Sequence, residues 1–144
     1  MKAVIYLTFP GNCAEAIELY KQAFNTTTTH VMKFGDMPPS ENFPIPAEYT
    51  DRILQATLKT NGDDYIRMSD CGPGHPFNNA ETEQVAIAIE DISVDAVKHA
   101  FDVLSKDGGR VGMPLSQTFF SECFGVVFDK FGVMWNLSAP AAKQ

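Results

Sequence analysis

Two stretches decide the fold of this chain: VIYLTF at residues 4–9 and QVAIAI at residues 84–89. Both are short runs of the residue types that favour β-strands. Each is followed by apolar residues at helical spacing, over residues 13–24 and 94–106, and then by three more strand-like runs. The same order of elements therefore occurs twice, as in an internal repeat. The pattern predicts an α+β fold, in which two paired βαβββ modules form a half-open curved sheet or barrel with the helices on the outside.

The first module covers about residues 1–70. Asn12 followed by Glu15 predicts an N-cap with a reciprocal acid at the start of its helix. The later strands are expected at three runs, and a tight turn at Asn61-Gly62-Asp63 joins the last two. These runs are residues 29–34, 53–60 and 65–69.

The second module covers about residues 83–140, after a linker at residues 71–82 that is rich in Gly, Pro and Asn. Ser93 is expected to cap its helix, and Gly108-Gly109 to end it. The three later strands are expected at residues 110–115, 123–129 and 133–137. The two modules together form a single domain over residues 1–144.

One irregular segment interrupts the first module. Residues 35–49 carry four prolines, which exclude a central strand or a long helix. The segment is also long for a plain connector. We interpret it as a lid or as an arm that contacts a partner.

The composition excludes several classes of protein. A formal net charge of −7 and a pI near 4.8 disfavour nucleic acid as a partner. No run approaches the roughly 20 apolar residues needed to span a bilayer, so we expect no membrane association. Three widely spaced cysteines, Cys13, Cys71 and Cys123, disfavour a disulfide framework and a cysteine zinc site. They are typical of reduced thiols, so a cytoplasmic location is expected.

Several segments along nearly the whole chain resemble one family. They are residues 6–16 (YLTFPGNCAEA), 34–38 (FGDMP), 68–70 (MSD), 124–125 (FG) and 129–136 (DKFGVMWN). In their order and spacing they resemble the vicinal oxygen chelate superfamily, which includes glyoxalases, bleomycin-resistance proteins and extradiol dioxygenases, and within it the PhnB-like branch. The resemblance implies paired βαβββ modules and a homodimer. Some relatives carry a methyltransferase label, but the chain lacks a glycine-rich turn after a strand that would bind such a cofactor.

Metal-dependent members of this superfamily hold a divalent ion with His or Glu from the first and last strand of each module. By the motif, the first position falls on Ile5, or on Tyr6 if the register slips by one. The remaining three positions fall on Asp70, Gln84 and Asn136. Amide oxygens bind Zn²⁺ or Fe²⁺ weakly compared with carboxylates and imidazoles. We therefore expect no metal and no cofactor, with a divalent metal as the alternative.

Strand alternation predicts which of these side chains line a cavity. Gln84, Ala86 and Ala88 should point away from the helix side of the sheet, and Met134 and Asn136 should do the same. Trp135 should then lie in the core. Gln84 and Asn136 are ligand-binding candidates, although both could be structural amides.

Three further residues belong to the candidate ligand-binding set. Asp70 either caps the turn before Gly72 or contacts a ligand. His30 is expected on a strand, where it could face the cavity, and Tyr6 on the first strand completes the set. Cys13 lies at a helix start, where the thiol pKa could be lowered, so it is a candidate nucleophile. We favour the alternative that it is a small packed residue.

Three functions follow from this pattern. The first is a metal-free, small-molecule-binding protein that holds an organic ligand in an apolar cavity of the curved sheet. The second is a metal-dependent lyase, isomerase or dioxygenase with a non-standard ligand set around Asp70. The third is a dimeric interaction protein whose cavity is filled by side chains such as Met32, Met113 and Met134.

Overall fold

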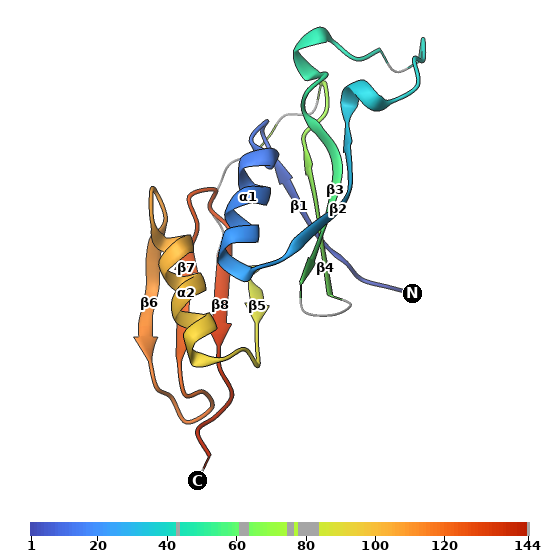
Figure 1. Ribbon diagram of the computed structural model, residues 1–144. Helices are drawn as coiled ribbons and strands as arrows, with labels where there is room; N and C mark the ends of the chain where they lie inside the picture. The colour runs from blue at the N-terminus through green and yellow to red at the C-terminus, as the bar shows by residue number, and fades with distance from the viewer. Residues whose placement is uncertain (43, 61–63, 75–76, 78–83, 144) are drawn as a thin grey trace. The chain divides into compact units, whose positions relative to one another are not determined.

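The computed structural model describes residues 1–42, 44–60, 64–74, 77 and 84–143. It contains two open four-stranded mixed sheets and two α-helices, so the α+β prediction is confirmed (Figure 1). The chain divides into two compact units. Unit 1 comprises Met1–Lys21 and Asn25–Asn78, and unit 2 comprises Gln22–Phe24 and Asn79–Gln144.

The sheet of unit 1 has the strand order β1-β4-β3-β2. Strand β1 is parallel to β4, and the other neighbours are antiparallel. The elements of this unit are β1 (Ile5–Phe9), α1 (Cys13–Phe24), β2 (Thr27–Lys33), the 3₁₀ turns η1 (Phe34–Asp36) and η2 (Ala47–Tyr49), β3 (Ile53–Thr60) and β4 (Asp64–Asp70). The turn expected at residues 61–63 lies outside the described residues.

One face of this sheet is apolar and buried, and α1 begins against it. Met68 of β4 lies between Leu7 of β1 and Ala56 of β3, so the three side chains share a face of the sheet. Asp70 shares their alternation and accepts a hydrogen bond from the first amide of α1. The buried residues of this region are Phe9, Cys13, Ala16, Ile17, Tyr20, Ala56, Leu58, Ile66 and Met68.

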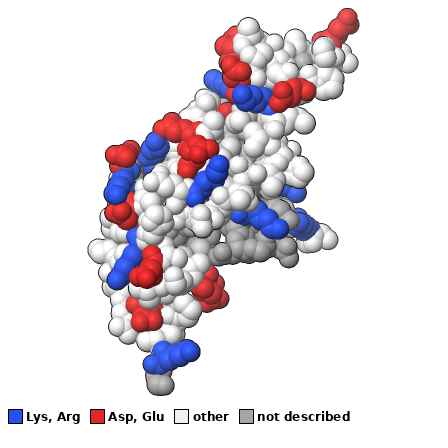
Figure 2. All heavy atoms as spheres, viewed as in Figure 1, with Lys and Arg blue, Asp and Glu red and all other residues white. Residues whose placement is uncertain are grey.

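The sheet of unit 2 repeats the same order as β5-β8-β7-β6. Its elements are β5 (Ile87–Ile89), α2 (Val94–Ser105), β6 (Arg110–Ser116), β7 (Phe124–Phe128) and β8 (Met134–Ser138). Helix α2 contacts β6, β7 and β8 (Figure 1). On the surface, acidic and basic side chains are interspersed over the helices (Figure 2).

Trp135 is the centre of the unit 2 core, as predicted. Its indole is fully buried, stacks at a tilt on Phe24 and donates from Nε1 to the Asp129 carboxylate at 2.9 Å. The second Asp129 oxygen accepts the amides of Phe131 and Val133. The carboxylate therefore holds the β7–β8 turn and the core indole together.

The helix boundaries agree closely with the sequence prediction, but one cap does not. Ser93 caps α2 by accepting from the amide of Ala96 at 3.1 Å, as predicted. Asn12, by contrast, makes no side-chain cap hydrogen bond, so the predicted capping box is wrong. The reason is tertiary, because Asp70 arrives from β4 and accepts from the amide of Cys13.

Strand β5 is shorter than predicted. It begins at Ile87 and pairs with β8 through Ile87–Trp135, Ala88–Asn136 and Ile89–Leu137. Continuing the parallel register would place Ala86 opposite Met134, where β8 begins. A strand needs a neighbouring strand for its backbone groups, and β8 does not extend far enough to pair with residues 84 and 85.

The described part of the chain contains no helix long and apolar enough to cross a membrane.

Candidate functional site

Asn136 lies at the centre of the helix-free face of the unit 2 sheet. In the register it is flanked by Ala88 of β5 and Val126 of β7. Burial alternates along β8, with Trp135 and Leu137 buried on the α2 side and Met134, Asn136 and Ser138 half-buried on the other. The Oδ1 atom of Asn136 is buried and has no hydrogen-bond partner within the described part of the chain. A buried carbonyl oxygen without a donor is costly, so this atom keeps an unused capacity to accept a hydrogen bond.

The surroundings of Asn136 are apolar and neutral apart from one arginine. Met134 and Phe128 are cross-strand partners on the same face, and the Arg110 guanidinium lies 3.8 Å from the centre of the Phe128 ring. Phe124 pairs with Ser138 at the other end of the face. The β5, β7 and β8 positions on this face contain no His, Cys, Asp or Glu. This face can hold an organic molecule, but it offers no strong ligand for a divalent cation.

Gln84 lies outside β5, so the strand alternation does not place it on this face. It is exposed and lies three residues before β5 begins. The alternation that placed it beside Ala86 and Ala88 required a strand from residue 84, and the strand covers only Ile87–Ile89.

Tyr6 and Asp70 lie on opposite faces of the unit 1 sheet. Tyr6 pairs with Arg67, whereas Asp70 pairs with Phe9, an odd number of residues away on β1. Asp70 is 3% exposed, and each of its oxygens accepts a backbone amide at 2.9 Å, Oδ1 from Cys13 and Oδ2 from Ile53. This carboxylate joins the end of β4 to the start of α1 and the start of β3.

The same contact determines the chemistry of Cys13. Burial, together with the neighbouring Asp70 carboxylate, raises the pKa of the Cys13 thiol from an ordinary value of 9.0 to about 12. The expectation that the helix start could lower this pKa is wrong, because desolvation outweighs the helix dipole. Cys13 is a packed thiol and not a nucleophile.

Two of the three histidines, His30 and His99, lie within the described residues. His30 is exposed, has a positive φ of 53° and lies in an irregular stretch of β2, where the pairing with β3 shifts between Thr29 and Met32. His99 on α2 contacts the backbone oxygen of Gln22 through Nε2 at 2.8 Å. Among the described residues no three His, Cys, Asp or Glu side chains come close enough to hold a metal ion.

The donor set therefore does not fit the metal that the family resemblance implies. Asp70, the one carboxylate among the four positions, is occupied by two backbone amides and faces α1. Asn136 supplies a neutral amide from an otherwise apolar face. These residues cannot supply the several anionic or imidazole ligands that a Zn²⁺ or Fe²⁺ site requires.

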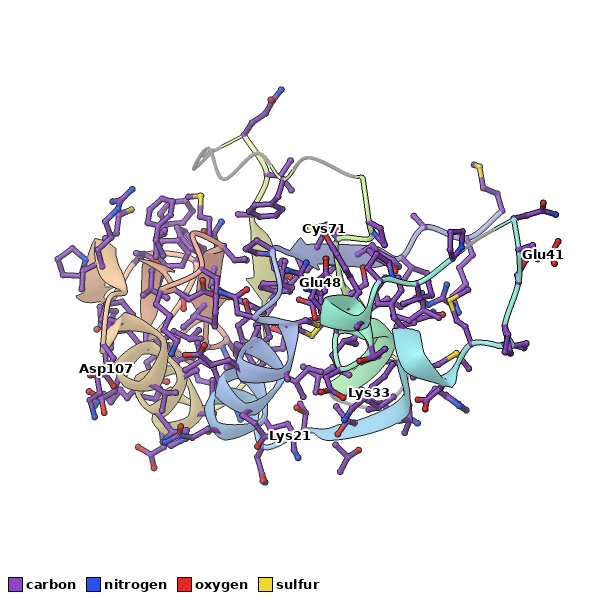
Figure 3. All side chains as sticks on the ribbon, turned by 90° about the horizontal axis from the view of Figure 1, so that it is seen from above. Lys21, Lys33, Glu41, Glu48, Cys71 and Asp107 are labelled. Atoms are coloured by element: carbon purple, nitrogen blue, oxygen red, sulfur yellow. The ribbon has the colours of Figure 1, made fainter. Side chains whose placement is uncertain are left out.

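The proline-rich segment lines a small, partly open cavity in unit 1. The cavity has a volume of about 280 Å³, and its lining comprises Phe34, Gly35, Met37, Pro38, Pro39, Ser40, Pro44, Ile45 and Thr50. Glu41 lies at the outer end of this segment, and Cys71 lies near the sheet, just after β4 (Figure 3). The Arg52 guanidinium stacks 4.3 Å from the Tyr49 ring centre, and Nη1 donates to the Cys71 carbonyl at 3.5 Å. Arg52 thus ties the end of the segment to the end of β4.

Sequence reasoning missed two arginines. Arg52 gave no signal because its partners, Tyr49 and the Cys71 carbonyl, belong to no recognisable spacing. Arg67 was not identified because it lies between two apolar residues of β4. A charged residue inside a strand is nevertheless a signal, because strand alternation places it on the face opposite its apolar neighbours.

Comparison with known proteins identifies the class. The Glyoxalase/Bleomycin resistance protein/Dioxygenase superfamily profile matches residues 5–137. The chain therefore belongs to this superfamily, and the predicted resemblance is confirmed.

Among individual proteins, the chain is 33% identical to Protein YjdN of Escherichia coli (strain K12) over 139 residues, 92% of this chain and 91% of the relative. The crystal structure of protein PA1353 from Pseudomonas aeruginosa is also 33% identical, with a TM-score of 0.80 over 97% of this chain and 98% of that one. A PhnB protein from Bacillus cereus, described as a putative 3-demethylubiquinone-9 3-methyltransferase, has the same fold, with a TM-score of 0.73 and 24% identity over 96% of this chain and 99% of that one.

Proposed function

We propose that this chain is a metal-free, small-molecule-binding protein of the vicinal oxygen chelate type. Its ligand lies on the helix-free face of the unit 2 sheet and donates a hydrogen bond to Asn136. Met134, Val126 and Phe128 supply apolar contact around that bond. The three free thiols, Cys13, Cys71 and Cys123, support a cytoplasmic location, where such thiols stay reduced.

The observation that carries this proposal is the unpartnered Oδ1 of Asn136. A buried polar atom left without a partner costs about 1–3 kcal/mol of stability. A residue that served folding alone would be better replaced by leucine, which has a similar shape. A ligand N–H or O–H that meets Oδ1 would recover this free energy on binding.

The first test uses Asn136→Leu, with Ser138→Ala on the same strand face as the matched control. Without ligand, the leucine variant should melt at a higher temperature than the wild type, because the unsatisfied oxygen is gone. In a thermal-shift screen of metabolites, compounds that stabilise the wild type should stabilise Ser138→Ala equally and Asn136→Leu hardly at all. A ligand at a hundredfold excess over its dissociation constant contributes about 2.7 kcal/mol.

Two results would overturn the proposal. One is a flat response of the wild type across a broad library. The other is a stoichiometric transition metal found by elemental analysis in untagged protein, which would favour the metal-dependent lyase, isomerase or dioxygenase.

A second candidate function, interaction with another copy of the chain, is favoured by an exposed aromatic cluster in unit 2. Phe119 is 96% exposed and Phe120 48% exposed, and the two rings stack edge to face at 5.2 Å. Phe120 stacks in turn on Phe124, and exposed Val111 and Met113 lie on the neighbouring edge strand β6. Edge strands and apolar patches are the features through which sheets associate.

Sedimentation velocity tests this homodimer. The wild type should sediment as a dimer and the double variant Phe119→Ser/Phe120→Ser as a folded monomer. A wild type that sediments as a monomer at 100 μM would contradict the interaction role. So would a double variant that remains a dimer.

A further inference from the structure

We propose that the helix-free face of the unit 1 sheet binds a small organic carboxylate, whose oxygens are held by Arg67. This site lies in unit 1 and does not rest on the role proposed for Asn136.

Arg67 occupies the middle of the sheet. It lies on β4, between β1 and β3, and pairs with Tyr6 on one side and Thr57 on the other. Its side chain points away from the face that carries the buried Ile66 and Met68. The guanidinium therefore lies on the opposite face of the sheet, on a strand that has a neighbouring strand on each side.

The neighbours of Arg67 on this face are hydroxyl groups. Tyr6 and Thr8 lie along β1, Thr57 lies across on β3, and Ser69 lies two residues further on β4. Thr57 and Ser69 are buried, while Arg67 is half-buried and Tyr6 is 51% exposed. Hydroxyls can donate hydrogen bonds to an anion held by the arginine.

Arg67 differs from the other two arginines in its contacts. Arg52 stacks on Tyr49, and Arg110 stacks on Phe128. The structure shows no hydrogen bond, ion pair or ring contact of the Arg67 side chain to another described residue. Within the described part of the chain, Arg67 is therefore the one arginine whose guanidinium has no ring or hydrogen-bond contact.

The charges on this face favour an anion. Among the strand residues whose side chains the structure describes, β1, β2 and β3 contain no Asp or Glu, and Asp70 of β4 belongs to the other face. Lys59, exposed near the hairpin end of β3, shares the alternation of Thr57 and adds positive charge. This face is therefore basic although the whole chain has a formal net charge of −7.

A carboxylate matches this arrangement better than a phosphate group. A guanidinium presents two parallel N–H donors that fit both oxygens of a planar carboxylate. A phosphate dianion is usually met by several cations or by a helix N-terminus. Here α1 begins on the other face, and Lys59 is displaced from Arg67 by one strand and two residues.

The arginine Nε–H signals in a ¹H–¹⁵N NMR spectrum test the proposal directly. The chain has three arginines, and single Arg→Lys variants assign their signals. Sodium benzoate is titrated into the wild type at constant ionic strength, with inorganic phosphate as the second arm. The Arg67 signal should move in a saturable way with benzoate, and the Arg52 and Arg110 signals should stay in place.

Variants separate this site from a merely structural role. Arg67→Lys keeps the positive charge but loses the two-pronged geometry, so it should weaken benzoate binding at least tenfold. Tyr6→Phe should weaken binding severalfold, and Arg52→Lys should bind like the wild type. Because Arg52→Lys and Arg110→Lys assign the Arg67 signal by elimination, the wild-type titration does not depend on whether Arg67→Lys folds.

Several outcomes would overturn the proposal. They are no saturable shift of the Arg67 signal, equal shifts of all three arginines, unchanged affinity in Arg67→Lys, and tighter binding of phosphate than of benzoate. A failure of Asn136→Leu in the screen above would leave this titration unaffected, so the two proposals fail separately.

Discussion

Asp70 shows at the scale of single residues how tertiary structure assigns a role that local sequence leaves open. The residue was compatible with a turn cap or a ligand contact, because both place a carboxylate at a strand end. In the structure both of its oxygens accept backbone amides that are distant in sequence, from Cys13 and Ile53. No local spacing encodes that convergence.

Asp70→Asn should destabilise the protein by about 1–3 kcal/mol. The asparagine oxygen can still accept one amide, but its NH₂ group cannot accept the other, which leaves a buried N–H without a partner. Urea unfolding measures the difference. Asp102→Asn is the control, because it removes only an exposed i,i+4 pair with Lys106 and should leave the urea midpoint almost unchanged. Equal midpoints for the two variants would contradict this role of Asp70.

Cys13 predicts an alkaline loss of stability. Its thiol ionises near pH 9.0 when unfolded and at about 12 when folded, so between these values the folded state binds more protons. The contribution of the neutral thiol to the free energy of unfolding is fully present below pH 9. It falls as the pH rises above 9, by up to about 1.4 kcal/mol per pH unit.

The measurement is urea unfolding of wild type and Cys13→Ala between pH 8 and 10.5. The variant should lose less stability over this range, whereas Cys71→Ala, at a half-exposed position, should follow the wild type. Parallel curves for wild type and Cys13→Ala would show that the thiol does not titrate as inferred.

At the scale of elements, the turn after α2 requires positive φ angles and also a residue without a side chain. The sequence predicted that Gly108-Gly109 stops the helix, and the structure ends α2 at Ser105, with positive φ at Asp107 and Gly108. Asp107 lies just beyond α2 (Figure 3). Gly109 has a different role, because a Cβ there would collide with the Leu104 carbonyl, Ser105 and the Phe128 carbonyl.

Gly109→Ala should therefore destabilise the protein by about 1–3 kcal/mol, because backbone atoms must move to admit the methyl group. Gly72→Ala is the matched control. A Cβ at Gly72 would lie 3.6 Å from the Phe34 ring, an ordinary contact, and no positive φ is required there. Thermal unfolding compares the two, and a Gly109→Ala variant as stable as Gly72→Ala would refute the steric argument.

Element boundaries were predictable where they depend on local chemistry and not where they depend on a partner strand. Ser93 accepts from an amide three residues away, so the start of α2 follows from sequence. The start of β5 depends on where β8 begins, which is remote in sequence. This is why Gln84 was wrongly expected in a strand, and why its place in the candidate site remains a prediction.

At the scale of the whole molecule, the formal net charge of −7 governs encounters with polyanions. Long-range repulsion disfavours binding to a phosphate backbone. The sequence also has no basic run that could neutralise phosphates and release their counterions, which is what drives nucleic-acid binding. Filter binding with a 20-bp DNA duplex at 50 mM salt should show no retention at 10 μM protein. Because Arg67 binds through short-range contact, its predicted affinity for benzoate is compatible with this result, whereas tight DNA binding would contradict the charge argument.

The amino-acid sequence alone determined the repeated βαβββ order, both helices, the buried indole of Trp135 and the superfamily, because periodicity and short-range turn and cap residues encode them. Only the tertiary structure decided that Asp70 serves the backbone, that Cys13 is buried beyond reactivity, that Asn136 keeps an unpartnered oxygen and that Arg67 stands among hydroxyls. These properties depend on strand register and burial, which bring together atoms that are far apart along the chain.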